Sequence, residues 1–92
     1  MRKTISKKEL ERYRAITEKA FLIVKENTFP NKKEEAKKII EMAGCYLSDS
    51  KHFEKKDDFV NAFGAIYYAH GWIDCGARLK IFNVTDDKLF TI

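Results

Sequence analysis

The chain has 92 residues, of which 45% are hydrophobic and 35% charged, and its net charge is +4. This length suits one domain, and this composition excludes a disordered or low-complexity chain. The first ten residues are basic without an apolar run behind them, and the longest uncharged run, residues 59–73, is too short to cross a bilayer. We therefore expect no secretory leader and no membrane span.

Cys45 and Cys75 lie far apart in the sequence, and neither belongs to a Cys-x-x-Cys pair. We interpret both as reduced thiols of a cytoplasmic protein, and we expect no zinc site. The sequence also lacks a phosphate-binding loop or a dinucleotide fingerprint, so we expect no cofactor.

The first predicted helix covers about residues 6–28. Ser6 and Glu9 fit a capping box, in which each side chain bonds the other residue's backbone amide. Pro30 disfavours helical backbone at Phe29 and ends the helix. Its buried stripe follows intervals of three and four residues: Leu10, Tyr13, Thr17, Ala20, Phe21 and Val24.

Two further helices are predicted, over about residues 32–56 and 59–81. Asn31, with Glu34 three residues later, is the expected cap of the first, and Asp58 is the expected N-cap of the second. The stripe of the helix over 32–56 comprises Ala36, Ile39, Ile40, Ala43, Tyr46, Leu47, Ser50 and Phe53.

Short turns between helices make neighbouring helices antiparallel. The predicted fold is therefore all-α, an antiparallel up-down-up three-helix bundle forming a single domain over residues 1–92. A short C-terminal tail, residues 83–92, carries apolar side chains that could dock on the bundle. Gly44 and Gly71 fall at the same height of the second and third helices, so we expect them to let the two backbones approach closely.

The third helix is apolar on both sides. At 100° per residue, its core face holds Phe59, Ala62, Phe63, Ile66, Ala69, His70, Ile73 and Ala77. The opposite side holds Tyr68, Trp72, Cys75 and Leu79, which we take as a candidate interface exposing about 500 Å². The tail, a second copy of the chain or another protein could cover it; alternatively, the helix is simply central, gripped by the other two.

Two Asp–His pairs invite a metal site, formed by Asp49 with His52 and by His70 with Asp74. Antiparallel packing puts the two histidines roughly 10 Å apart along the bundle, too far to share a metal ion. We expect no metal there.

His70, Asp74 and Arg78 follow one another at helical spacing, and we interpret them as a polar ladder at the edge of the core. A catalytic histidine would need a nucleophile, and Cys45 lies off the buried stripe of its helix. We therefore expect no enzymatic activity.

Basic residues concentrate in residues 1–41, with 12 Lys/Arg against 7 Asp/Glu. The alternative functional prediction is an RNA-binding module that contacts phosphates through a basic patch on the first helix and the start of the second. The candidate residues are Lys7, Lys8, Arg12, Lys32, Lys33 and Lys37. A solvated helix face explains the same residues, because acidic residues are interspersed among them.

Three stretches carry a family resemblance: YLSDSKHF at residues 46–53, DFVNA at 58–62 and YAHGWIDCG at 68–76. They resemble a family of small, mostly archaeal helical domains catalogued as domain of unknown function number 357. The resemblance implies a three-helix bundle and no known activity. This chain departs from the family's glycine at Asp57 and at Lys80, and the second departure leads us to expect a later end of the third helix.

The leading functional hypothesis is a non-enzymatic interaction module. It would self-associate or bind a protein partner through the third helix, with RNA binding as the alternative.

Overall fold

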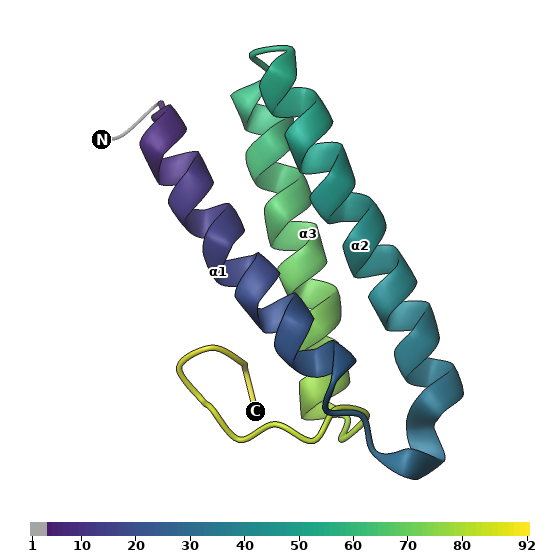
Figure 1. Ribbon diagram of the computed structural model, residues 1–92. Coiled ribbons are helices and arrows are strands. Elements are labelled where there is room, and N and C mark those ends of the chain that lie inside the picture. Colours follow the sequence, from purple (N-terminus) through teal and green to yellow (C-terminus); the bar gives the residue numbers. More distant parts are fainter. Residues whose placement is uncertain (1–3) are drawn as a thin grey trace.

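The computed structural model describes residues 4–92, which form an antiparallel bundle of three α-helices (Figure 1). α1 is Lys7–Lys25, α2 is Lys33–Lys55 and α3 is Phe59–Arg78, with one turn of 3₁₀ helix, η1 (Pro30–Lys32), before α2. α3 packs against both other helices, whereas α1 and α2 touch each other much less. The predicted all-α up-down-up bundle is confirmed, and α3 is its central helix.

Two of the predicted helix caps form as expected. The Ser6 hydroxyl accepts a hydrogen bond from the backbone amide of Glu9 at 3.1 Å, and the Glu9 carboxylate accepts one from the Ser6 amide at 3.3 Å. The Asp58 carboxylate accepts from the backbone amide of Asn61 at 3.2 Å. These bonds satisfy amides that the first turn of a helix leaves unpaired.

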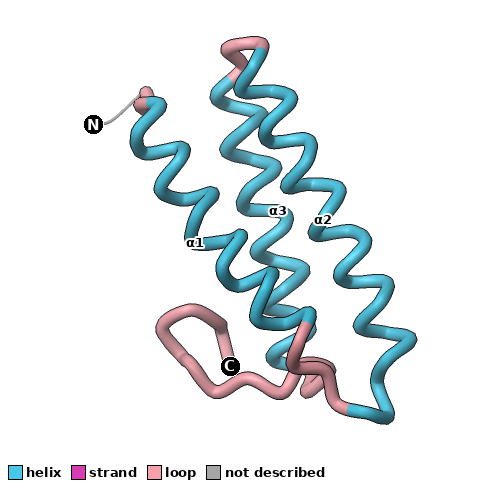
Figure 2. The backbone as a smooth tube through the Cα atoms, viewed as in Figure 1, coloured by secondary structure: helices cyan, strands magenta, loops and turns pink. Residues whose placement is uncertain are grey.

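α1 ends at Lys25 rather than near residue 28, so that boundary was wrong. The residues that follow pair with the segment after α3 instead: the Asn83 amide donates to the Asn27 carbonyl at 2.7 Å, and the Phe29 amide donates to the Ile81 carbonyl at 3.1 Å. Figure 2 shows these two loop segments side by side at one end of the bundle. Pairing between segments distant in sequence therefore fixes where α1 stops.

The predicted cap at Asn31 is also wrong. Asn31 lies inside η1, and α2 begins after Lys32, whose side chain makes no capping hydrogen bond. Pro30 at the first position of η1 presets the backbone for a helical turn, so the tight turn forms first and α2 continues from it.

α2 and α3 both end in a Schellman motif, in which a residue in the left-handed region closes the helix. Asp57 has φ 58° and Lys80 has φ 61°. After Lys80, the Ile81 amide donates back to the Gly76 carbonyl at 2.9 Å. The expectation that α3 runs to about residue 81 is wrong, because Lys80 adopts the conformation that glycine would favour.

The core consists of two clusters. The larger one lies toward the η1 end of the bundle and includes Phe82 and Phe90, which are 1% and 3% exposed. The smaller one joins Leu10 of α1 to Ala62 and Ile66 of α3. The tail thus docks on the bundle through Phe90. None of the helices within residues 4–92 combines the length and hydropathy needed to cross a membrane.

The predicted close approach of Gly44 and Gly71 does not occur. A Cβ atom at Gly44 would lie 3.4 Å from the Phe21 ring of α1, and one at Gly71 would meet nothing within 4 Å. The tightly packed glycine is Gly76, where a Cβ would lie 3.1 Å from Ile39 Cδ1 and overlap the Phe82 ring.

Candidate functional site: the outer face of α3

One side of α3 is exposed and almost without charge. We call it the outer face, formed by Val60, Gly64, Tyr67, Tyr68, Gly71, Trp72, Cys75 and Leu79. Tyr68 is 65% exposed, Leu79 62% and Trp72 38%, and Cys75 is exposed as well. The four residues predicted as an interface therefore lie together on this face and face outward.

The tail does not cover the outer face, so the prediction that the tail could cover this side of the helix is wrong. The tail packs on the α1 side of α3, while the central position of α3 leaves this third side open. The only cover of Tyr68 among the described ring contacts is Tyr46 of α2, whose ring stacks on it with centroids 5.1 Å apart. A whole aromatic side chain has a surface of about 200 Å². At their exposed fractions, Tyr67, Tyr68 and Trp72 together leave roughly 320 Å² of aromatic surface open.

Two glycines in the middle of the outer face have no packing role within the chain. A Cβ at Gly64 or at Gly71 would meet nothing within 4 Å. Each glycine costs a helix interior about 1 kcal/mol relative to alanine. With Cys75, they form a shallow strip of small residues between the rings of Tyr67 and Tyr68, so another backbone has room to approach α3 closely.

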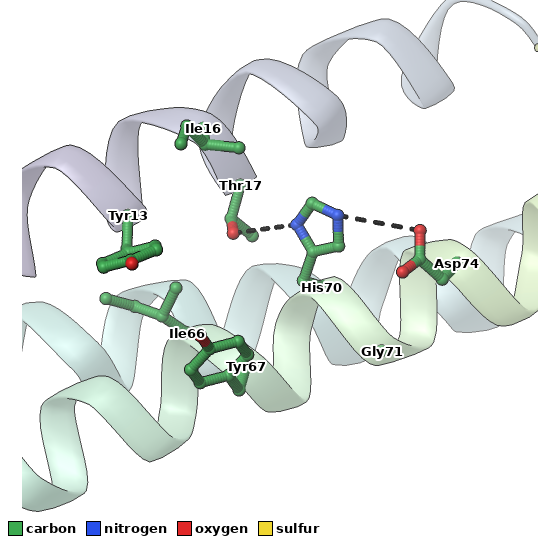
Figure 3. Close-up of a pocket in the computed structure, with 8 residues that line it drawn as sticks. All are labelled: Tyr13, Ile16, Thr17, Ile66, Tyr67, His70, Gly71 and Asp74. Atoms are coloured by element: carbon green, nitrogen blue, oxygen red, sulfur yellow. Dashed lines mark hydrogen bonds and ion pairs between the residues drawn. The ribbon is translucent and has the colours of Figure 1, made fainter. Parts of the chain in front are cut away.

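A groove between α1 and α3 adjoins the outer face (Figure 3). Its volume is about 320 Å³, and Tyr67 and Gly71 belong to both the groove and the outer face. Apolar side chains make most of its walls. The lining residues are Tyr13, Ile16 and Thr17 from α1 and Ile66, Tyr67, His70, Gly71 and Asp74 from α3.

His70 ties α1, α3 and the tail together at the end of this groove. Its Nε2 lies 3.0 Å from the Leu89 carbonyl oxygen, and its Nδ1 lies 3.0 Å from the Thr17 hydroxyl. Because a carbonyl only accepts, Nε2 carries the proton, and in the neutral ring Nδ1 accepts from the hydroxyl. Both ring nitrogens are therefore engaged in holding the fold.

The predicted polar ladder forms only in part. Asp74 Oδ1 lies 3.6 Å from His70 Nε2, and the Asp74 carboxylate accepts from both the amide and the hydroxyl of Thr91 at 3.0 and 3.1 Å. Among the described residues no ion pair joins Arg78 to this carboxylate. Asp74 faces the tail instead, so His70 and Asp74 form a clasp for residues 89–91.

Within residues 4–92, no three His, Cys, Asp or Glu side chains come close enough together to hold a metal ion. Cys45 and Cys75 are both free thiols. At 100° per residue, Cys45 lies on the side of α2 opposite its buried residues, away from His70.

The structure does not gather the candidate basic residues into one patch. Lys7, Lys8 and Arg12 lie at the start of α1, while Lys32, Lys33 and Lys37 lie at the start of α2, at the opposite end of the bundle (Figure 1). The length of α1, about 27 Å, separates the two groups. RNA binding stays a prediction that this arrangement does not favour.

Sequence reasoning missed part of the outer face. Val60, Gly64 and Tyr67 belong to it, and Gly71 faces outward rather than toward α2. The signal was available, because Gly64, Tyr68, Gly71 and Cys75 follow one another at intervals of four, three and four residues, which place them on one stripe of a helix.

Comparison with known proteins identifies the family. Residues 12–82 match a family described as a protein of unknown function, DUF357. The chain belongs to the DUF357 family. The match covers most of α1 and all of α2 and α3, and it confirms the resemblance seen in the sequence, while the tail from residue 83 lies beyond it. No curated protein and no solved structure matches the chain.

Proposed function

We propose that this DUF357 protein is a non-enzymatic helical interaction module whose α3 outer face binds protein, either a second copy of the chain or a different one. The observation that carries the proposal is the exposure of Tyr67, Tyr68 and Leu79, each more than half exposed, on a helix side whose one charged residue is Arg78 near its C-terminal end. The largest exposed apolar patch of a monomer, a few hundred square ångströms in size, is often functional.

Aromatic composition supports the same proposal. Tyr and Trp are enriched at the centres of protein interfaces, because they bury a large area at little entropic cost and keep a polar tip for hydrogen bonding. The open glycines support it too, since they weaken α3 in the isolated chain without any contact that offsets their cost.

The two cysteines provide an internal experiment, because Cys75 lies on the outer face and Cys45 lies on the far side of α2. The rate of alkylation of each thiol is measured by mass spectrometry in intact cells and in dilute purified protein. If the concentration of free partner in the cell is about ten times the dissociation constant, only about a tenth of the chain is unbound. We then expect Cys75 to react about tenfold more slowly in cells than in dilute solution. Cys45 should react at similar rates in both.

A Trp72→Glu variant serves as the matched comparison. The charge should prevent docking and restore the reactivity of Cys75 in cells, while circular dichroism of the variant remains that of the wild type. Equal protection of Cys75 and Cys45, or protection of Cys75 that survives this substitution, would remove the outer face as a binding surface.

A further inference from the structure

We infer that the outer face of α3 pairs with the same face of a second copy of this chain, with the two α3 helices antiparallel. The inference rests on the proposed function and names its partner. It draws on three features of the described residues: the position of the small residues, the charges at the two ends of α3, and the area that is exposed.

The first feature is the register. The exposed apolar stripe runs from Val60 to Leu79, so an antiparallel pair overlaps along its whole length only when residues whose numbers sum to about 139 lie at one level. At this register Tyr68 of one copy lies over Gly71 of the other, and Gly64 lies opposite Cys75. The Tyr68 ring then lies over a residue that has no Cβ, as large-to-small packing requires, while Tyr67 of one copy lies at the level of Trp72 of the other.

The second feature is charge. Asp57 and Asp58 precede α3, while Arg78 and Lys80 lie at its other end, and all but the half-buried Asp58 are exposed. Antiparallel pairing at this register brings Asp57 and Asp58 of one copy close to Arg78 and Lys80 of the other, twice by symmetry. A parallel pair would instead set like charges together, so charge selects the antiparallel arrangement and a second copy carries the complementary ends.

The third feature is area. Each outer face offers on the order of 500 Å², so the pair buries about 1,000 Å² in total, at the lower limit for a specific complex. We therefore expect a reversible dimer with a dissociation constant on the order of micromolar or weaker. The uncharged centre supplies the contact, and the charged ends set its direction.

Cysteine cross-linking tests the register. In a Cys45→Ser/Gly64→Cys variant, position 64 of one copy faces the native Cys75 of the other, so mild oxidation should give a covalent dimer linked 64 to 75. The single variant Cys45→Ser leaves two Cys75 residues about 16 Å apart along the antiparallel pair, too far for a disulfide. A Cys45→Ser/Lys37→Cys variant, with its new thiol on α2, controls for random collision.

Each outcome decides for or against the pairing. A 64-to-75 dimer at a yield well above that of the Lys37→Cys control supports it. A Cys75-to-Cys75 dimer in the single variant indicates parallel pairing and overturns it. A purified chain that sediments as a monomer up to about 1 mM also overturns it; if Cys75 is nevertheless protected in cells, the proposed function stands with a different partner.

Charge reversal gives an independent test of direction. Lys80→Glu should weaken dimerisation several-fold in low salt, because it replaces attraction between position 80 of one copy and Asp57 of the other with repulsion, and adding Asp57→Lys should restore it. The two positions lie roughly 35 Å apart along one α3, so the rescue can act only between copies. A double variant as weak as Lys80→Glu alone would overturn the antiparallel arrangement.

Discussion

Replacing Lys80 by glycine is expected to stabilise the monomer. Lys80 holds φ at 61°, where its Cβ crowds the backbone, and Ile81 and Gly76 fix this conformation through the hydrogen bond that closes α3. A residue with a side chain costs about 1–2 kcal/mol of folding free energy in the left-handed region, and glycine avoids this cost. Glycine also makes the unfolded chain more flexible, which offsets part of the stabilisation. We expect a net gain of about 1 kcal/mol for Lys80→Gly, and about half that for Asp57→Gly, because Asp tolerates this region better.

The assay is urea and thermal unfolding at a protein concentration low enough to keep the chain monomeric. A gain of 1 kcal/mol raises Tm by about 4–8 °C in a domain of this size. Lys80→Ala is the matched control, since it removes the charge and the long side chain but keeps the Cβ, and it should give no gain. The two glycine variants should add, because their sites lie at opposite ends of α3. Equal stabilisation by Lys80→Ala, or none by Lys80→Gly, would refute the conformational explanation.

Three other substitutions probe the packing that positions the outer face. Gly76→Ala should destabilise the chain by about 1–3 kcal/mol in denaturant titrations, because the new methyl group overlaps the Phe82 ring. Arg14→Met should cost about 2–3 kcal/mol by leaving the Glu54 carboxylate without its ion pair, and Arg14→Met/Glu54→Met should recover most of that loss. Phe90→Ala should cost about 3 kcal/mol and lower Tm, because it empties the site where the tail docks, whereas an unchanged Tm would show that the tail adds nothing to stability.

The helices could be predicted because they follow from local rules. The spacing of Leu10, Thr17 and Val24 marks one stripe of α1, and all three are buried. Ser6 and Asp58 cap helices through bonds that span three residues. Information of this kind is contained in a short window of sequence, which is why the order, number and direction of the helices could be stated in advance.

The ends of the helices could not be predicted in the same way. α1 stops early because residues 27–29 pair with residues 81–83, a contact across more than half of the chain. Asp57 and Lys80 adopt positive φ without being glycine, and the family's tendency toward glycine at both positions was the one available signal. Long-range pairing and side chains in unusual backbone conformations leave no local pattern to detect.

Arg14 shows that a count of basic residues in the sequence does not tell which of them are exposed. It counts among the basic residues of the first half, yet it is buried, bonds the Ser50 hydroxyl at 3.1 Å and pairs with Glu54 at 2.6 Å. The predicted buried stripe of α1 did not include Arg14, although Arg14 follows Leu10 by four residues and is buried. A buried arginine keeps its charge when acceptors surround it, so its charge gave no sign of its burial.

The outer face was predicted in its main residues and missed in its centre. Tyr68 and Trp72 stand out as aromatic residues opposite the core, whereas glycine has no side chain to suggest a role. Gly71 was assigned to the contact with α2 from its height in the bundle, but height along a helix says nothing of direction around it. The structure supplied that direction.

The bridge between Thr28 and Phe82 makes the two ends of the bundle unequal in their resistance to opening. At the η1 end, loop pairing, the docked tail and the larger core cluster restrain one another, while at the other end Leu10, Ala62 and Ile66 alone join α1 to α3 in the buried core. Amide hydrogens in the first turns of α1 should therefore exchange through local fluctuations, ahead of those near Val24 that await global unfolding. The start of α1 would open first, while the contacts at the η1 end of the bundle persist.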